Sequence, residues 1–252
     1  MENNLTDRKF WEEYWRSYQY SDIPEHVYFE KFIPKMAIGS TAIEVGGFPG
    51  TISIFFHKNY GLDVSLLDYY IDINIVHNLE IHNGLPSDTI HCIEHDFFSY
   101  QSDIKYDLVY SIGFIEHFED TSDVIKRHVD LLADNGNLLI VLPNFLGLNG
   151  FIQKRFDRHN YDAHNLKSMD LEFLKETMTQ LPVKEVYIDY IGKPMVWLEP
   201  DASRNSRFKR MAVKTLSYLI KLIPIKGKLL SPYIIIRAKK NLIGFCYESY
   251  PS

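Results

Sequence analysis

The ten residues from Thr41 to Gly50 (Thr-Ala-Ile-Glu-Val-Gly-Gly-Phe-Pro-Gly) constrain the fold of this chain more than any other stretch. A short apolar run ends there in Glu44 and a glycine-rich loop. A second apolar run ends in Asp68, eighteen residues beyond the loop. Two apolar runs that each end in an acid suit a nucleoside-bearing ligand, held at the carboxyl ends of two neighbouring parallel strands.

Length and composition indicate an ordinary globular chain. The 252 residues are 46% hydrophobic and 24% charged, which allows one large core, or one core with an attached lobe. Two cysteines, Cys92 and Cys246, argue against a disulfide framework and favour a reducing compartment. The N-terminus lacks the profile of a signal peptide, and no apolar run reaches the roughly 18 residues that span a bilayer. We therefore expect a cytoplasmic protein.

Strand-like and helix-like runs alternate along the chain. Aromatic side chains recur at i, i+4 over 7–19 and predict a helix, and the triplet Asp134-Asn135-Gly136 is expected to stop a later helix. The stretch 143–167 lacks periodicity and is expected to be a long connection. Strands are predicted over 41–45, 64–68, 90–95, 107–112, 137–142, 184–190 and 233–239, and further helices over 50–59, 71–80, 121–133 and 168–179. This alternation predicts an α/β fold, a mainly parallel sheet covered on both faces.

The glycine loop does not match the common phosphate-binding motifs. A dinucleotide loop beginning at Gly46 requires glycine at positions 48 and 51, where this chain has Phe48 and Thr51. The loop also lacks the Gly-Lys-Ser/Thr ending of a Walker-type loop that binds nucleoside triphosphates. Glu44 would repel a pyrophosphate, and it would instead attract a ligand that carries an ammonium or sulfonium group.

Residues 41–144 resemble the class I S-adenosylmethionine-dependent methyltransferases, especially those that act on small molecules. The resemblance rests on the order and spacing of several motifs, each of which is weak alone. They are Glu44–Gly50, Leu66-Leu67-Asp68, His95-Asp96-Phe97, Tyr106–Ser111 with Ile115–Phe118, and Leu131–Val141, and Tyr233–Lys240 resembles the family's last, antiparallel strand.

The resemblance implies a doubly wound, Rossmann-like sheet of seven strands, mostly parallel, with an antiparallel last strand and helical accessory elements. It implies one domain over 1–252: an N-terminal helical lid (1–36), a cofactor-binding core (37–145), acceptor-side insertions (146–182 and 192–232) and a last strand (233–241). S-adenosylmethionine is the implied cofactor. Asp68 is implied to bind its ribose, Asp96 its adenine amino group and Phe97 the adenine face. The other implied cofactor residues are Glu44, Gly46, Gly47, Gly50 and Ser111.

Phe48 departs from the family pattern, which usually has a glycine there. A phenylalanine at positive φ would be strained. We therefore expect the loop to keep a negative φ at this position, with the ring turned into the core. The alternative is an altered cofactor pocket and a protein without activity.

Candidate catalytic residues follow the fourth strand, where the acceptor should approach. His117 is the first candidate for a general base, since a histidine can take a proton near neutral pH, and Glu116 is its rival; a structural role for His117 stays open. His159 and His164 are further candidates, and Arg155 and Arg158 could hold an anionic substrate. His91, Cys92, His95 and Asp96 look rich in ligands but complete no tetrahedral site, so no metal is expected.

These observations predict a methyltransferase for a small or medium-sized acceptor, most simply an oxygen of a sugar, a glycan precursor or a secondary metabolite. The alternative is a non-catalytic binding or scaffold protein with the same fold. Residues 204–240 carry eleven Lys and Arg and no acid, interleaved with apolar residues at helical spacing. This segment is either a solvated basic face or a contact for an anionic substrate, partner or membrane surface. The acidic remainder of the chain argues against nucleic acid.

Overall fold

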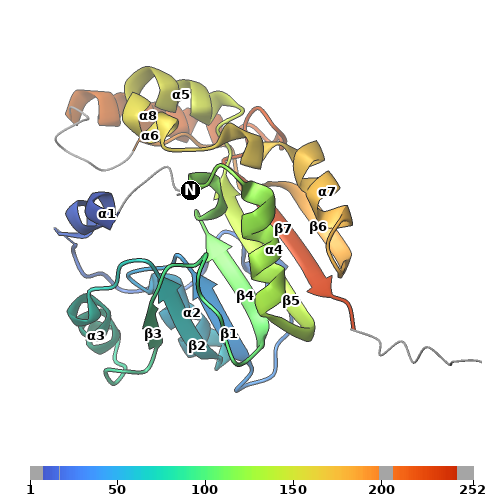
Figure 1. The fold of residues 1–252 in the computed structure, drawn as a ribbon. Helices are drawn as coiled ribbons and strands as arrows, with labels where there is room; N and C mark the ends of the chain where they lie inside the picture. The colour runs from blue at the N-terminus through green and yellow to red at the C-terminus, as the bar shows by residue number, and fades with distance from the viewer. Residues whose placement is uncertain (1–7, 17, 199–206, 243–252) are drawn as a thin grey trace, which may run out of the picture.

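The computed structural model describes residues 8–16, 18–198 and 207–242, and it contains a seven-stranded sheet in the order β3-β2-β1-β4-β5-β7-β6. The strands are β1 (Thr41–Val45), β2 (Asp63–Asp68), β3 (His91–Glu94), β4 (Tyr106–Ile112), β5 (Leu132–Pro143), β6 (Val183–Ile191) and β7 (Tyr233–Lys240). The first five pair in parallel, and β7 pairs antiparallel with both β5 and β6. The predicted fold class and antiparallel last strand are confirmed (Figure 1).

Helices cover both faces of the sheet because its strand residues alternate between two cores. On one face, α4 (Thr121–Leu131) and α7 (Leu171–Thr179) pack against Ile43, Val45 and Val109. On the other, α2 (Thr51–Tyr60) and α3 (Ile73–His82) pack against Ala42 and Leu108. Both cores are closed to solvent, so the sheet is a rigid base for side chains at its edge.

The strand register brings the two acids of the opening motif to the same edge. Glu44 pairs with Leu66 and Val45 with Leu67, so Glu44 and Asp68 both lie at the carboxyl-terminal end of neighbouring strands. The chain then turns into α2 through Gly50, whose φ of +95° suits a residue without a side chain. Right-handed crossovers place the ends of β3 and β4 at this edge as well.

Two local predictions are wrong. The helix α4 ends at Leu131 rather than at the Asp134–Gly136 triplet, which lies within β5. Pairing between β4 and β5 shifts there, and Asn135 adopts a φ of +58°. The residues that resemble a helix stop supply the positive φ of a strand irregularity instead.

The stretch 143–167 is not an irregular connection. It contains α5 (Leu148–Phe156), α6 (Arg158–Asp162) and the start of the 3-10 helix η3 (Leu166–Met169). These elements are short, and side chains of Asp157 and Asn165 cap the second and third of them. Short capped helices carry too few turns to give an apolar period, which explains the missing signal.

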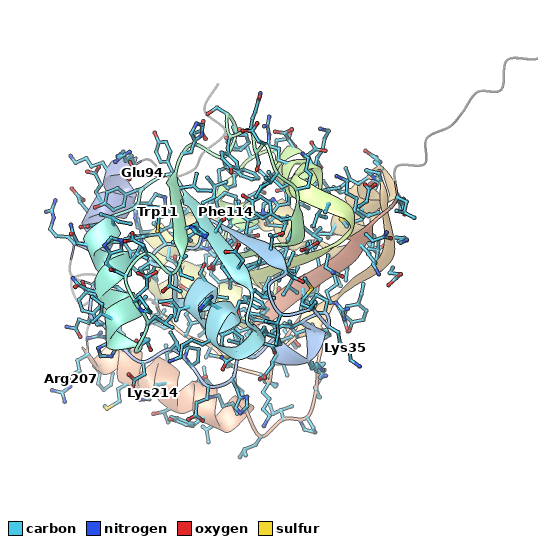
Figure 2. The ribbon with its side chains drawn as sticks, turned by 90° about the horizontal axis from the view of Figure 1, so that it is seen from below. Trp11, Lys35, Glu94, Phe114, Arg207 and Lys214 are labelled. Carbon is cyan, nitrogen blue, oxygen red and sulfur yellow. The ribbon has the colours of Figure 1, made fainter. Side chains whose placement is uncertain are left out.

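The helix α8 (Arg207–Ile220) lies with α5 and α6 at the end of the sheet toward which β4 points (Figure 1). It buries Val213 and Ile220 against Ile152 of α5 and exposes Arg207 and Lys214 (Figure 2). Among the described residues, no helix is long and apolar enough to cross a membrane. Arg204 and Cys246 lie outside the described residues.

Candidate active site

A cavity of about 440 Å³ opens at the carboxyl-terminal edge of the sheet. The predicted cofactor residues Glu44, Gly46, Gly47 and Asp68 line one part of it. The predicted catalytic residues Glu116 and His117 line another, together with His159 and His164. The structure therefore brings both sets of side chains, which are far apart in the sequence, to one cavity.

Glu44 is the last but one residue of β1, and its carboxyl group is buried, with 2% of the residue's surface exposed. Ser53 Oγ donates a hydrogen bond to Glu44 Oε2 at 2.5 Å, and Tyr110 Oη donates to the same oxygen at 3.4 Å. Burial raises the pKa of Glu44 from 4.5 to about 8, and the nearby Asp68 adds to the rise. A positive group in the cavity would offset both effects, so this end favours a cation.

Asp68 ends β2 and is held by the loop it faces. Its Oδ2 accepts a hydrogen bond from the backbone N–H of Phe48 at 3.0 Å, and its Oδ1 accepts one from Tyr70 at 3.4 Å. Burial raises the pKa of Asp68 to about 6, although these backbone bonds oppose the rise. The carboxylate is thus fixed at the cavity wall and still has lone pairs for ligand hydroxyls.

Two glycines of the loop, Gly46 and Gly47, stand where a side chain would collide with a neighbouring residue. Gly46 has a φ of +68°, and a side chain there would overlap the ring of Phe114. A side chain on Gly47 would overlap the Glu44 carboxyl group. Both positions therefore need glycine for room, and Gly46 also needs it for its positive φ.

Phe48 keeps its ring in the core, as predicted. The described non-glycine residues with positive φ do not include it, and 5% of its surface is exposed. Its ring packs edge-on against Trp15 at 5.3 Å and Tyr70 at 5.7 Å between centroids. The departure from glycine thus builds an aromatic wall of the cavity without backbone strain.

The remaining predicted cofactor residues lie away from the large cavity. Asp96 and Phe97 line a neighbouring cavity of about 30 Å³, which Gly46 and Asp68 also line. Ser111 is fully buried and bonds to His128 Nε2 at 3.1 Å, so it lines neither cavity. Gly50 is the N-cap of α2.

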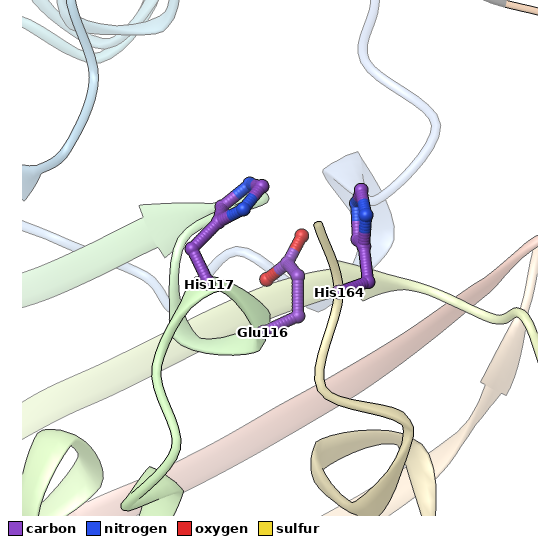
Figure 3. Close-up of side chains that lie close together, drawn as sticks. All are labelled: Glu116, His117 and His164. Carbon is purple, nitrogen blue, oxygen red and sulfur yellow. The ribbon is translucent and has the colours of Figure 1, made fainter. Parts of the chain in front are cut away.

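Glu116, His117 and His164 form a cluster at the other end of the large cavity (Figure 3). Glu116 and His117 lie in the 3-10 helix η2 (Ile115–His117), directly after β4. Burial raises the pKa of Glu116 to about 8. Burial also lowers the pKa of His117 to about 3 and that of His164 to about 4, so both imidazoles are neutral at pH 7.

One asparagine fastens the two segments of this cluster together. The backbone N–H of Asn165 donates to Glu116 O at 2.7 Å, and its side chain donates to Phe118 O and Glu119 O. His164 thereby lies beside His117, with 4.8 Å between the ring centroids. Nothing in the sequence spacing indicates this pairing, because the two histidines are separated by several elements.

The aromatic helix α1 (Arg8–Trp15) borders the cavity. Trp11 and Trp15 line it, and Trp11 lies edge-on to His117 at 5.6 Å. Arg8 bonds to Glu94 at the end of β3 at 2.9 Å, which ties the helix to the sheet edge. This helix is shorter than the helix predicted over 7–19.

Sequence reasoning missed two aromatic lining residues, Phe114 and Trp197, which have no local motif. Arg155 and Arg158 were expected to hold an anionic substrate, but both are exposed and neither lines the cavity. Arg158 pairs instead with Asp162 one helical turn away at 2.8 Å.

Comparison with known families gives one match. The profile of a family described as "Methyltransferase domain" matches residues 9–181, which is more than half of the chain. No curated protein matches the sequence.

Solved structures share the fold at low identity. Phosphoethanolamine N-methyltransferase 2 from Haemonchus contortus, in complex with S-adenosyl-L-methionine, has 17% identity and a TM-score of 0.60 over 85% of this chain and 51% of its own. The present chain thus spans about half the length of that protein. Geranyl diphosphate C-methyltransferase from Streptomyces coelicolor has 12% identity and a TM-score of 0.57 over 90% of this chain and 96% of its own. A putative sarcosine dimethylglycine methyltransferase from Galdieria sulphuraria has 14% identity and a TM-score of 0.53 over 81% of this chain and 80% of its own.

Proposed function

The chain belongs to the methyltransferase-domain family, and on that premise we propose that it transfers the methyl group of S-adenosylmethionine to an oxygen of a small or medium-sized acceptor. One observation carries the proposal. A single cavity has an acidic end at Glu44 and Asp68 and a second polar end at Glu116 and His117. The first suits a cationic nucleoside, and the second suits an acceptor group that must lose a proton.

The acidic end supports the cofactor assignment through charge. S-adenosylmethionine carries an ammonium and a sulfonium group, and Glu44 is a buried carboxyl that a nearby cation would ionise. Asp68, held by the Phe48 backbone, offers carboxylate oxygens to two ribose hydroxyls, as the family resemblance implies. Asp96 and Phe97 are proposed for the adenine ring, and the loop glycines Gly46 and Gly47 for close backbone approach.

The other end supports transfer to oxygen. Methyl transfer needs an in-line nucleophile and exclusion of water, because the sulfonium carbon is already electrophilic. A hydroxyl nucleophile also gains from a group that removes its proton, by roughly 10² to 10⁴ in rate. His117 Nδ1 donates a hydrogen bond to Ala163 O, so Nε2 carries the free lone pair of this ring. The Glu116 carboxyl lies in the same cluster. We propose that these two residues activate the acceptor, with the unprotonated His117 Nε2 as the proton acceptor and the protonated Glu116 carboxyl beside it.

The alternative function is a binding or scaffold protein that has the fold without the chemistry. Calorimetric titration with S-adenosylmethionine and with S-adenosylhomocysteine separates the two. We expect both to bind, and Asp68→Ala to lower the affinity at least tenfold, while Asp63→Ala at the opposite end of β2 leaves it unchanged. Failure of both compounds to bind at millimolar concentration would overturn the enzyme assignment.

The catalytic role is tested by turnover with a panel of sugar, glycan-precursor and phenolic acceptors. His117→Ala should slow methyl transfer while the affinity for S-adenosylhomocysteine stays within about twofold. If this variant loses cofactor binding instead, His117 has a structural role. Release of S-adenosylhomocysteine with each methylated product is the readout.

A finer proposal concerns partners. The exposed face of α8 and the residues after it combine Lys214 and Lys221 with Phe208, Tyr218 and Leu222, of which Leu222 is 82% exposed. Basic and apolar side chains on one face suit the surface of an anionic membrane. We propose that this face contacts such a surface transiently, and that the protein otherwise works in the cytoplasm.

A further inference from the structure

We propose that Glu116, His117 and His164 bind one divalent transition-metal ion, and that this ion holds the acceptor oxygen during methyl transfer. The first evidence is convergence. One ligand atom from each of the three side chains lies within 4.8 Å of the others, and all three residues line the large cavity (Figure 3). The site was not expected from the sequence, which directed attention to His91 and Cys92 instead.

The tautomers of both imidazoles follow from their backbone partners. His117 Nδ1 lies 3.1 Å from Ala163 O, and His164 Nδ1 lies 2.6 Å from Asn160 O. A carbonyl oxygen can only accept a hydrogen bond, so Nδ1 carries the proton in each ring. Nε2 therefore carries the free lone pair in each neutral ring. Histidine ligands in metal sites have the same arrangement, in which a backbone carbonyl fixes the ring and its tautomer.

The third ligand is a buried carboxyl oxygen without a partner. Glu116 Oε2 is closed to solvent and has no hydrogen-bond partner among the residues that the structure describes, and the residue is 1% exposed. A buried acceptor left unpaired is destabilising, and more so when it is charged. The Nε2 atoms of His117 and His164 carry no proton, so they cannot donate a hydrogen bond to Glu116 Oε2. Once the Glu116 carboxyl is ionised, the three side chains offer acceptors and no donor, and this combination suits a cation that replaces the carboxyl proton.

The ligand set indicates which cation. Two imidazole nitrogens and one carboxylate are typical of Mn²⁺, Fe²⁺, Co²⁺ or Zn²⁺ sites with open positions, whereas Mg²⁺ and Ca²⁺ prefer oxygen ligands alone. The positions of the ligands are also fixed, because Asn165 hydrogen-bonds the His164 segment to the backbone of η2 and of the residue after it. Three protein ligands leave positions for substrate, as in catalytic rather than structural sites.

The proposed ion deepens the function assigned above and rests on it, since it acts on the acceptor of the same reaction. One carboxylate balances only one of its two charges, so an anionic oxygen is the favoured further ligand. A hydroxyl bound there releases its proton to water. Its oxygen then forms a bond to the methyl carbon as the carbon–sulfur bond breaks, and the sulfonium becomes the neutral thioether of S-adenosylhomocysteine. When the ion is bound, His117 Nε2 is its ligand and no longer the proton acceptor.

The experiment titrates the chelator-treated full chain with Co²⁺ and follows the visible absorption bands that report coordination geometry. We expect one tightly bound Co²⁺ per chain, and competition by Zn²⁺ and Mn²⁺ but not by Mg²⁺. Glu116→Gln and His164→Gln should each weaken the binding at least tenfold. The matched control is His91→Gln, because His91 is an exposed histidine that pairs with Asp63.

Two measurements keep the outcome clear. Far-ultraviolet circular dichroism checks that the variants fold, and titration with S-adenosylhomocysteine checks the cofactor end in each of them. Intact cofactor binding with no stoichiometric Co²⁺ overturns the metal site alone, as do bands that persist in folded Glu116→Gln. Loss of the bands in both ligand variants but not in His91→Gln supports the site, even where the wild-type chain binds no cofactor and the proposed function fails.

Discussion

Glu44→Gln offers a direct test of the electrostatics at the acidic end of the cavity. The Glu44 carboxyl has a pKa of about 8 in the folded protein, against an ordinary value of 4.5. The folded chain therefore binds this proton more tightly than the unfolded chain does. The stability it contributes is complete below pH 4.5 and is lost as the pH rises toward 8.

The size of the effect follows from the two pKa values. Each unit of difference corresponds to about 1.4 kcal/mol, and the residue is too buried for solvent to screen it. Between pH 6 and pH 8 the wild-type chain should lose about 2 kcal/mol of unfolding free energy through Glu44 alone. Glutamine has nearly the same shape and does not titrate, so Glu44→Gln should lack this loss.

The assay is urea denaturation of both proteins at pH 6 and pH 8. The quantity of interest is the difference between wild type and variant, because other titrating groups cancel in it. Glu172→Gln on the surface of α7 serves as the control and should follow the wild type, since its side chain is 84% exposed. The difference in unfolding free energy between wild type and variant should change between pH 6 and pH 8. A change of less than about 0.5 kcal/mol, which is the limit of the extrapolation, would refute a buried, protonated Glu44.

Three further predictions concern other parts of the molecule. Asp68→Asn should raise the dissociation constant of S-adenosylmethionine by about 10- to 100-fold in calorimetry, because a charged acceptor of two hydrogen bonds is lost; an unchanged constant would remove Asp68 from the site. Phe48→Ala should lower the unfolding free energy by about 3 kcal/mol in urea, since the ring is buried between Trp15 and Tyr70; a loss under 1 kcal/mol would contradict that packing. Replacing Lys214 and Lys221 by Glu should abolish sedimentation with phosphatidylserine vesicles and leave the folded state intact; equal sedimentation of variant and wild type would rule out the proposed surface.

The placement of the acidic half of the cavity could be predicted from sequence because its signals are local. Glu44 and Asp68 each end an apolar run, and parallel strands bring such ends together whatever the rest of the chain does. The conformation of Phe48 could be predicted in the same way, from the steric cost of positive φ. The wrong assignment of Asn135 shows the limit of such local rules, since a helix stop and a strand bulge both require a residue that tolerates positive φ.

In the other half, Glu116, His117 and His164 could be named as candidates from the sequence, but their arrangement could not be predicted because these residues meet only in the folded chain. His164 lies in a stretch of short helices whose caps, Asp157 and Asn165, are visible in the sequence but carry no information about direction. The hydrogen bonds of Asn165 to the turn after β4 set its position. Trp197 enters the cavity from a segment beyond β6, again without a motif.

Phe114 connects the two halves. Its ring lies over Gly46, packs against Phe97 at 5.4 Å and Phe118 at 4.7 Å, and lines both the large and the small cavity. The small cavity, at about 30 Å³, has room for only about two water molecules. If adenine binds beside Asp96 and Phe97, as proposed above, this cavity must widen.

The residues that follow Phe114 lie at the other end of the large cavity. Phe114 immediately precedes η2, so the same short turn carries Glu116 and His117 into the acceptor end of the cavity. A backbone movement at Phe114 would also move two of the three proposed metal ligands, because they follow it directly in the chain. Asn165 resists the displacement through its bond to Glu116 O. Because one turn carries both Phe114 and these ligands, we expect cofactor binding to alter the geometry of the Glu116, His117 and His164 cluster.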